Sequence, residues 1–361
     1  MFTLPEYIPP DFSKPEFVAA PQVRTLPAPA DGVLPDAYYA TNIYPEYFKI
    51  AGEWRLISAP RMDCAVVIQD GFPVATEARR VLRGAAVVTG REEDLSNGVY
   101  TDYTAFQTVN GRGQHFAFRT TKSRETSFSR DYDELYEILR HDRDHGSVVW
   151  VLGPAVAFDF DSRRAMAGLV NHGYVHAVLA GNALATHDME ASLFHTGLGQ
   201  DIYTKELCYN GHYHHLETIN RVRRSGSVEQ FIRENPSQDG IVAACVRKGV
   251  PMVLAGSIRD DGPLPGVIPN VYDAQDAMRR HTMKATTIIA LATQLHTIAT
   301  GNMTPSWQLR DGKLRPVYFY TVDISEFAVG KLHDRGSLST ISIVTNAQDF
   351  LINTARSLNV L

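Results

Sequence analysis

The sequence predicts an α/β protein whose C-terminal part is a doubly wound parallel sheet and whose N-terminal part is a smaller β-rich domain. After Gly146, short apolar runs alternate with helical segments, whereas before Thr120 the chain shows only β-like runs between Gly, Pro and Asp turns. Alternation of strands and helices is typical of parallel sheets with helices on both faces. In such sheets a ligand lies beyond the carboxyl ends of the strands, so we expect functional residues directly after each apolar run.

The composition is that of a globular, mildly acidic protein. The chain has 361 residues, and 35 Lys and Arg against 40 Asp and Glu give a net charge of −5. This length allows two domains with separate cores. A nucleic-acid-binding protein concentrates basic residues on one face, so we expect no nucleic-acid partner. The three cysteines, Cys64, Cys208 and Cys245, form no CxxC pair, which favours a reducing cytoplasm over a disulfide framework.

Neither a signal peptide nor a membrane segment is expected. The N-terminus has no basic start and no apolar run. Ala285–Leu309 contains no Asp, Glu, Lys or Arg and is long enough to span a bilayer. It nevertheless contains six threonines together with Gln294, His296 and Pro305, which is too polar for a lipid-facing helix. We therefore expect a buried strand followed by a ligand-facing loop, and no membrane partner.

Composition distinguishes three parts of the chain. Residues 1–30 are rich in proline and carry little periodic pattern, which is typical of an arm. Residues 31–120 are predicted to form the small β-rich domain and residues 121–361 the doubly wound domain. The β-like runs of the small domain are Trp54–Ile57, Ala65–Ile68, Ala85–Thr89 and Phe116–Thr120.

The larger domain is predicted to begin with a helix, Asp131–Arg140. Apolar runs then predict strands that are buried on both faces. These strands are Val148–Leu152, Val175–Leu179, Val250–Ala255, Thr286–Ala292, Val317–Val322 and Ile341–Thr345. One predicted helix ends at His172, where Gly173 suits a C-cap. The others are His214–Arg224, Gly240–Lys248, Ala274–Arg280, Ser325–His333 and Ala347–Leu358.

Small and polar residues follow several of these strands. After Leu179, the small residues Ala180 and Gly181 let backbone amides approach a ligand at the start of a helix. Asp323 follows Val322, where a carboxylate can bind the hydroxyls of an adenosine ribose and disfavour a 2′-phosphate. An N-cap for the next helix explains Asp323 equally well. No strand is followed by GxGxxG, so any dinucleotide must be held by another set of loops.

Six strings of the sequence carry a family resemblance. They are Asp31–Asp36, Tyr39–Asn42, Met62–Cys64, Leu179–Glu190, Val250–Ile268 and Leu291–Asn302. They resemble the archaeal-type ornithine cyclodeaminases, a family that includes the C-terminal region of cyanobacterial arginine dihydrolase/ornithine cyclodeaminase fusions. The resemblance implies a Rossmann-like domain of the deoxyhypusine-synthase type and tightly bound NAD. It also implies a small amino-acid substrate, ornithine, that is converted to proline and ammonia.

At the positions that match the family's motifs, the resemblance places the NAD contacts at the strand ends. The residues are Asn182, Ala183, Asp261, Thr293, Gln294, Leu295, His296, Asp323, Asn346 and Ala347. Family members commonly have Met where Gln294 stands and Asp-Val where Asn346 and Ala347 stand, and Trp307–Arg315 is an insertion-like segment. No guanidine-removing domain precedes the match, so arginine is not an expected substrate. Another basic amino acid is the alternative to ornithine.

The implied chemistry needs a base for the amine and a cation for the substrate carboxylate. Candidate bases are His187, Asp188, Asp260 and Asp63, of which His187–Asp188 is favoured because it lies just beyond the loop that follows Leu179. Charge complementation at the helix N-terminus is the alternative role for Asp188. Arg259 is the candidate clamp for the carboxylate, or it only pairs with Asp260.

The resemblance also places substrate contacts in the small domain. Asn42 and Asp63 would hold the distal amine, and Cys64 would line the pocket. Turn formation and a small buried residue are the alternatives. His212–His215 together with His187 offers enough ligands for zinc, but adjacent histidines point in different directions, so no metal is expected.

The leading hypothesis is an NAD-dependent ornithine cyclodeaminase. The alternatives are an NAD-dependent dehydrogenase or synthase acting on another basic amino acid or amine, a non-catalytic NAD-binding sensor and, last, a metal-dependent hydrolase built on the histidines. A sensor would not need the proton-transfer candidates around His187. We also expect a homo-oligomer, because large sheet folds leave apolar surface to cover.

Overall fold

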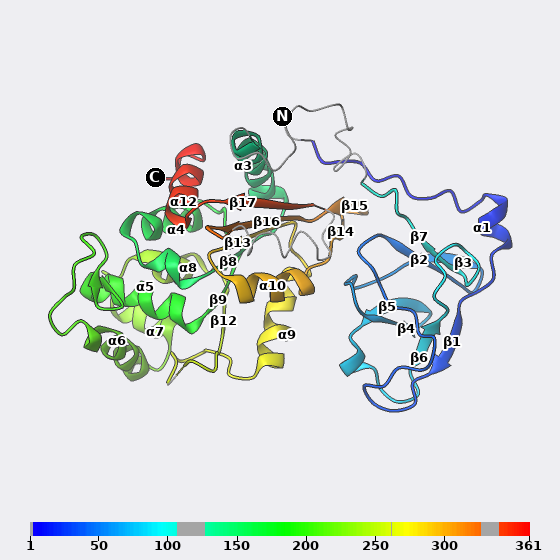
Figure 1. The fold of residues 1–361 in the computed structure, drawn as a ribbon, viewed down its shortest axis with the longest axis horizontal. Coiled ribbons are helices and arrows are strands. Elements are labelled where there is room, and N and C mark those ends of the chain that lie inside the picture. The colour runs from blue at the N-terminus through cyan, green and yellow to red at the C-terminus, as the bar shows by residue number, and fades with distance from the viewer. Residues whose placement is uncertain (1–2, 107–126, 261, 326–338) are drawn as a thin grey trace.

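A six-stranded parallel sheet forms the centre of the C-terminal part of the chain (Figure 1). The computed structural model describes residues 3–106, 127–260, 262–325 and 339–361. In spatial order the strands are β12 (Met252–Ala255), β9 (Ala177–Gly181), β8 (Val148–Leu152), β13 (Thr287–Leu291), β16 (Tyr318–Asp323) and β17 (Thr340–Val344). Each neighbouring pair is parallel. The predicted α/β class with a doubly wound sheet is confirmed.

Helices cover both faces of this sheet, because side chains point to alternate faces along each strand. One face is covered by α3 (Ser127–His145), α4 (Phe160–Asn171), α8 (Gly240–Lys248) and α12 (Ala347–Ser357), and the other by α9 (Val271–Thr282) and α10 (Gln294–Met303). Trp150 and Leu152 pack in a core with the first four helices, whereas Val149 and Val151 pack in a second core with α9 and α10. Burial on both faces explains why the strands are continuous apolar runs.

The strand order contains a topological switch between β8 and β13. Along the chain, β8, β9 and β12 extend the sheet toward one edge, and β13 then pairs on the other side of β8. Such a switch leaves a crevice at the carboxyl ends of the two central strands. Gly153 allows these ends to lie in contact, since its N–H donates to the Leu291 carbonyl at 2.9 Å and a Cβ would overlap the carbonyl oxygen of Ala292.

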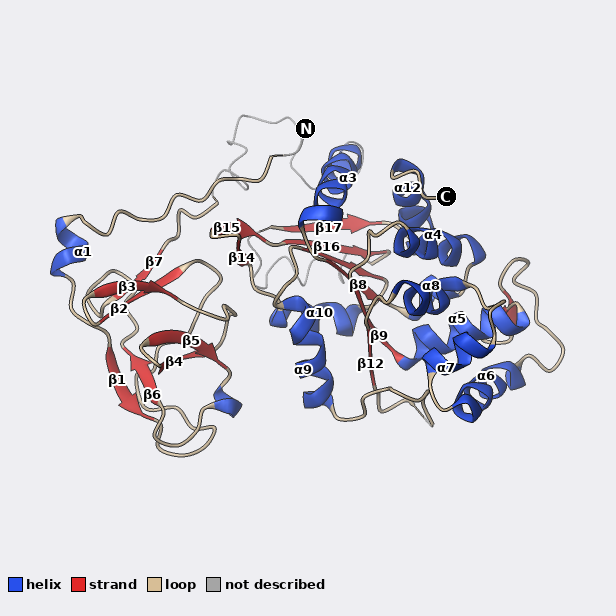
Figure 2. Cartoon of the chain, turned by 180° about the vertical axis from the view of Figure 1, so that it is seen from behind, coloured by secondary structure: helices blue, strands red, loops and turns tan. Residues whose placement is uncertain are grey.

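The remaining elements of this part surround the sheet edge. They are η2 (Pro154–Ala157), α5 (Asn182–Phe194), β10 (Thr196–Gly197), β11 (Gln200–Asp201), α6 (His212–Ser225) and α7 (Val228–Glu234). The helix predicted at His214–Arg224 is therefore confirmed within α6. Figure 2 shows α5 and α6 at the end of the sheet that lies away from the β-rich part.

One expectation for the threonine-rich segment after β13 is wrong. The segment was expected to be a ligand-facing loop, but Gln294–Met303 forms α10. The hydroxyl of Thr304 donates to the carbonyl of Thr300 at 2.7 Å, and that of Thr297 donates to the carbonyl of Thr293. These bonds pair the hydroxyl groups of Thr297 in the helix and of Thr304 at its C-cap, whereas Oγ1 of Thr300 has no hydrogen-bond partner among the described residues. Among the described residues, no helix is long and apolar enough to cross a membrane.

Two antiparallel sheets make up the N-terminal part. One contains β1 (Arg24–Pro27), β6 (Ala86–Thr89), β4 (Ala65–Gln69) and β5 (Phe72–Thr76), and the other contains β3 (Glu53–Leu56), β2 (Glu46–Ile50) and β7 (Val99–Thr101). The short helices α1 (Pro15–Ala19) and η1 (Ala78–Arg80) flank them. Tyr39, Phe48 and Val66 lie in their common core.

The structure corrects the expectation of a detached arm at residues 1–30. Arg24–Pro27 pairs along β6, so part of this segment belongs to the first sheet. The sequence pattern missed β1 because all its side chains are exposed and show no apolar alternation. Phe116–Thr120 and most of Ser325–His333 lie outside the described residues. The proposed domain boundary at residue 120 stays a prediction for the same reason.

A hairpin joins the two parts of the chain. It consists of β14 (Trp307–Arg310) and β15 (Lys313–Pro316) and corresponds to the insertion-like segment of the sequence. Trp307 is 2% exposed and packs in the core of the β-rich part. The hydroxyl of Ser306 donates to the carbonyl of Ile43. The hairpin therefore fixes the β-rich part against the sheet.

Candidate functional site

A cavity of about 580 Å³ opens at the carboxyl ends of β8, β9, β12 and β13. This is the position that the strand order predicts for a ligand. Residues from the ends of different strands meet there. Those singled out in the sequence are Asn182, Ala183, His187, Arg259, Asp260, Thr293 and His296. The structure brings these residues together, and their individual roles stay predictions.

Two helices begin at this cavity. Asn182 starts α5 and Gln294 starts α10, and residues at both starts line the cavity. Among the described residues, no side chain caps the N-terminus of either helix. The first N–H groups of a helix lack intrahelical partners and carry partial positive charge. The cavity therefore offers two backbone sites for an anionic group such as a phosphate.

Gly181, at the end of β9, lets a histidine lie close to the start of α5. A Cβ at this position would lie 3.2 Å from Cε1 of His296, which is tighter than an ordinary contact. Burial lowers the pKa of His296, so its ring is neutral at neutral pH. The neutral ring of His296 thus lies at the start of α5, where it and Gly181 both line the cavity.

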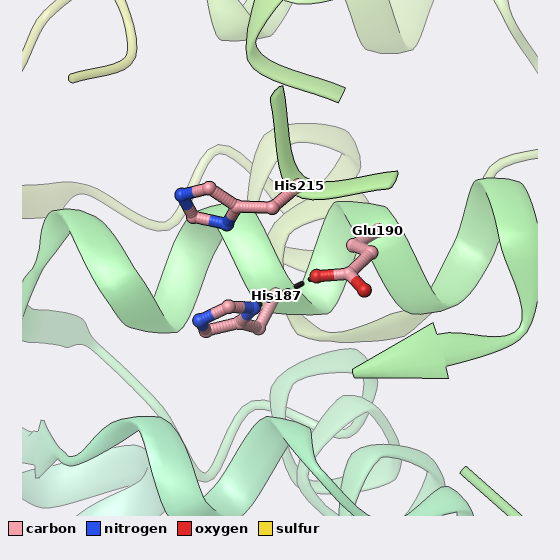
Figure 3. A group of neighbouring side chains, drawn as sticks. All are labelled: His187, Glu190 and His215. Carbon is pink, nitrogen blue, oxygen red and sulfur yellow. Dashed lines mark hydrogen bonds and ion pairs between the residues drawn. The ribbon is translucent and has the colours of Figure 1, made fainter. Parts of the chain in front are cut away.

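Three titratable side chains lie side by side at the cavity (Figure 3). His187 and Glu190 come from α5 and His215 from α6. Nδ1 of His187 lies 2.9 Å from Oε2 of Glu190, because residues three apart share one face of a helix. The ring centres of His187 and His215 are 4.9 Å apart. Both histidines line the cavity, and Glu190 is fully buried beside them.

The surroundings of Glu190 hold it as a carboxylate. Its Oε1 accepts hydrogen bonds from Oγ1 of Thr196 at 2.9 Å and from the N–H of Gly199 at 3.0 Å. Burial raises the pKa of Glu190, but the hydrogen bonds from His187, Gly199 and Thr196 outweigh it and leave the pKa below its usual value. Because a carboxylate only accepts, this geometry assigns the proton to Nδ1 of His187. In a neutral ring with this tautomer, Nε2 is the acceptor atom.

The same three side chains have the composition of a metal site. One ligand atom from each of His187, Glu190 and His215 lies within 4.8 Å of the others. Two histidines and one carboxylate are the protein ligands of some catalytic zinc sites. Nδ1 of His215 is buried and has no hydrogen-bond partner in the described part of the chain. Burial and the neighbouring His187 lower the pKa of His215, which keeps its ring neutral. The expectation of no metal stays a prediction.

The loop after β12 carries Arg259 and Asp260 to the cavity. The N–H of Ser257 donates to Oδ2 of Asp260 at 2.9 Å, and the N–H of Arg259 donates to Oγ of Ser257 at 3.2 Å. Local hydrogen bonds thus shape the loop, while Arg259 and Asp260 still line the cavity. Asp261 lies outside the described residues.

The structure corrects the expectation for Asp188. Its side chain is fully buried, accepts a hydrogen bond from Nε of Arg163 at 2.8 Å and accepts another from the N–H of Val242 at 2.8 Å. It lies on a different face of α5 from His187, since consecutive helical residues are about 100° apart. Gly240 is required here, because a Cβ would lie 2.5 Å from Oδ1 of Asp188. Asp188 therefore ties α5 to α4 and α8, and it does not reach the cavity.

Sequence reasoning missed Glu190 as the partner of His187. The spacing of three residues within a predicted helix was the available signal. The contacts of Glu190 with Thr196 and Gly199 depend on the turn after α5, which leaves no comparable pattern in the sequence.

Other predicted cofactor contacts lie along the same edge of the sheet. Gln294 and Leu295 are in the first turn of α10, and Leu295 is 76% exposed. Asp323 ends β16 and accepts a hydrogen bond from the N–H of Ser325 at 2.9 Å. Asn346 caps α12 by accepting from the N–H of Asp349 at 2.7 Å, and Ala347 begins that helix. The described lining of the cavity does not include these residues, so their cofactor roles stay predictions.

The predicted substrate contacts of the small domain lie elsewhere. Oδ1 of Asn42 accepts from the N–H of Tyr44 at 2.8 Å, as in an Asx turn. Asp63 lines a second cavity at the junction of the two parts. Cys64 is 2% exposed, and burial raises the pKa of its thiol. Within one chain, the described lining of the sheet-edge cavity includes neither Asn42 nor Asp63 nor Cys64.

Comparisons of sequence relate this chain to named proteins. Residues 133–354 match the family described as arginine dihydrolase ArgZ-like, C-terminal, Rossmann fold. The chain is 40% identical over 333 residues to an ornithine cyclodeaminase of Methanopyrus kandleri, covering 91% of this chain and 77% of the relative. It is 34% identical over 344 residues to the bifunctional arginine dihydrolase/ornithine cyclodeaminase AgrE of Nostoc sp., covering 90% of this chain and 45% of AgrE.

Solved structures extend these similarities. A conserved putative LOR/SDH protein of Methanococcus maripaludis S2 superimposes with a TM-score of 0.82 at 33% identity, covering 94% of this chain and 98% of that one. A ternary complex of AgrE with ornithine and NAD⁺ superimposes with a TM-score of 0.59 at 32% identity, covering 94% of this chain and 46% of that one.

Proposed function

The chain belongs to the family of the archaeal ornithine cyclodeaminases and the ArgZ-like fusions, and from this premise we propose that it is an NAD-dependent ornithine cyclodeaminase. The reaction converts L-ornithine to L-proline and ammonia without net oxidation or reduction. The AgrE complex, which holds ornithine and NAD⁺, supports this choice of substrate and cofactor. The observation that carries the proposal is that His187 lines the cavity where two helices begin and is paired with the buried Glu190.

The residues around the cavity fit NAD. The uncapped starts of α5 and α10 suit the diphosphate. Asp323, at the same edge of the sheet, suits the ribose hydroxyls and disfavours a 2′-phosphate, which selects NAD over NADP. When bound, NAD⁺ supplies reversible removal of a hydride from the substrate's α-carbon.

In this proposal His187 is the base that takes a proton from the substrate amine at Nε2. Glu190 holds the proton on Nδ1 and stabilises the positive charge that develops on the ring. The neutral ring of His215 beside it adds no opposing charge. Positioned acid–base groups of this kind contribute about 10²- to 10⁴-fold to rate.

The loop after β12 supplies the polar contacts for the amino acid. Arg259 binds the substrate carboxylate through its planar guanidinium group. Asp260 binds the distal ammonium group of the substrate. Both side chains line the cavity. Both come from the loop after β12, and β12 is the neighbour of β9, the strand that leads into α5.

The test is an assay of purified protein with L-ornithine, with and without added NAD⁺. We expect proline and ammonia in equal amounts with no steady build-up of NADH. His187→Asn should reduce the rate about 10²- to 10⁴-fold, whereas His212→Asn, which changes an exposed histidine of α6, should leave it unchanged. Steady accumulation of NADH would instead indicate a dehydrogenase, and equal rates in the two variants would exclude His187 as the base.

A further inference from the structure

Cationic side chains from both parts of the chain gather where the β-rich part meets α9. They are Arg61, Arg79 and Arg80 from the β-rich part, and Arg279, Arg280 and Lys284 from α9 and the turn after it. Glu77 lies at their centre, and its carboxylate forms ion pairs with four of these guanidinium groups, those of Arg61, Arg79, Arg80 and Arg279. Asp276 pairs with Arg79 and Arg80. The few carboxylates are thus shared among many cations.

A cavity of about 640 Å³ opens at this cluster. Its charged lining residues are the cations Arg80, Arg279, Arg280 and Lys284 and the carboxylates Glu77 and Asp276. The described linings of this cavity and of the sheet-edge cavity have no residue in common. It is therefore a separate place from the site proposed for NAD and ornithine.

The two carboxylates do not neutralise the cluster. Burial lowers the pKa of the Arg61 guanidinium, and the charges of Arg279 and Arg79 lower it further. Burial also lowers the pKa of His281, and the charges of Lys284 and Arg280 lower it further. Glu77 and Asp276 raise the pKa of Arg80, so the excess of positive charge follows from the lining of the cavity itself, where four cations stand against these two carboxylates.

The cations that face the cavity differ in how they are held. Arg80 and Arg279 are anchored by Glu77, which fixes part of each guanidinium fork before any ligand arrives. Arg280 and Lys284 are exposed. A ligand would thus meet two guanidinium groups positioned by Glu77 and two exposed cationic side chains. Arg supports paired hydrogen bonds to phosphate or carboxylate, and Lys adds a point charge.

We propose that this cavity binds a small polyanion, a molecule with adjacent phosphate or carboxylate groups, and that the bound polyanion bridges the β-rich part and α9. More than one anionic group is needed, because the cations stand on two separate parts of the chain. The proposal goes beyond the ornithine reaction, whose amino-acid substrate carries a net positive charge.

Binding is tested by titration calorimetry of the full chain with pyrophosphate and, separately, with citrate. Saturating NAD⁺ is present so that pyrophosphate cannot occupy the sheet-edge cavity. The variant is Arg280→Ala/Lys284→Ala, which leaves the ion pairs of Glu77 intact. The matched control is Arg224→Ala/Lys248→Ala, which removes the same charge from exposed positions of α6 and α8.

We expect at least one of the two anions to bind the wild-type chain and the control with equal affinity, and to bind the variant at least tenfold more weakly. Tighter binding of pyrophosphate identifies a phosphorylated ligand, and tighter binding of citrate a polycarboxylate. Equal affinity for the variant and the control, or no heat of binding with either anion, overturns the proposal. Melting temperatures without ligand establish that the variant is folded, and the ornithine assay on the same samples reports separately on the proposed function.

Discussion

Two faces of α5 each carry a buried carboxylate, and the two carboxylates have different partners. On one face, Asp188 pairs with Arg163, and on the other, Glu190 pairs with His187. Both carboxylates are fully buried, and they are only two residues apart in the sequence. Asp188 faces the packed layer of α4 and α8, whereas the partner of Glu190 lines the cavity.

The partner therefore decides what the carboxylate does. A guanidinium group stays protonated at any physiological pH, so the Asp188–Arg163 pair can only hold helices together. An imidazole gains and loses a proton near neutral pH, so a carboxylate that orients it prepares a proton acceptor. The comparison predicts that changes on the two faces of α5 affect different measurements.

The largest effect is expected for Glu190→Gln. The glutamine amide can donate to Nδ1 of His187 and favour the ring with its proton on Nε2, which cannot accept a proton from the substrate. We expect kcat to fall about 10²- to 10⁴-fold, with KM for NAD⁺ nearly unchanged. Steady-state kinetics of proline formation measure this, and Glu217→Gln, at a partly exposed position of α6, is the control. A loss confined to KM would mean that Glu190 supports binding instead of proton transfer.

The free energy of unfolding of the same variant, measured as a function of pH, gives a second test of the comparison. The pKa of Glu190 is lowered in the folded chain. Its contribution to stability is therefore complete above the pKa of an unfolded glutamate and is lost as pH falls through the folded value. The free energies of unfolding of wild type and Glu190→Gln should consequently approach each other in acid. A gap that widens as pH falls would contradict a carboxylate at this position.

A smaller effect, on stability alone, is expected for Asp188→Ala. The change leaves Arg163, which is 2% exposed, without its buried partner. Breaking a buried ion pair on one side costs about 3–5 kcal/mol in free energy of unfolding. Urea denaturation measures this loss, and kcat of the folded enzyme should stay unchanged.

Asp239→Ala provides the matched control, because Asp239 also pairs with Arg163 but is 63% exposed. Exposed pairs contribute about 0–1 kcal/mol. If Asp188→Ala unfolded like Asp239→Ala yet lost activity, Asp188 would belong to the catalytic face after all.

The fold of the C-terminal part was predictable because its strands are buried on both faces. Val148–Leu152 is apolar at every position for that reason, and the alternation with helices fixed the class. β1 was not predictable, because an exposed edge strand such as Arg24–Pro27 has no apolar pattern. α10 was not predicted because a bond such as that from the Thr297 hydroxyl to the carbonyl of Thr293 exists only once the helix has formed.

The site was predictable at the level of strand ends but not of partners. Thr293, Asn182 and Asp260 were found because the carboxyl ends of parallel strands meet at one edge. The expectation that Asp188 shares the site with His187 is wrong, because adjacent residues of a helix point in directions about 100° apart. Residues three apart share a face of a helix, whereas neighbours do not.

The central claim is that ornithine becomes proline by removal and return of one hydride at the same α-carbon. Mass spectrometry of proline formed from L-[2-²H]ornithine with unlabelled NAD⁺ tests it most directly. The account predicts proline that keeps its deuterium at Cα, formed by wild type and by His212→Asn and greatly slowed in His187→Asn. Proline without deuterium at Cα would contradict it.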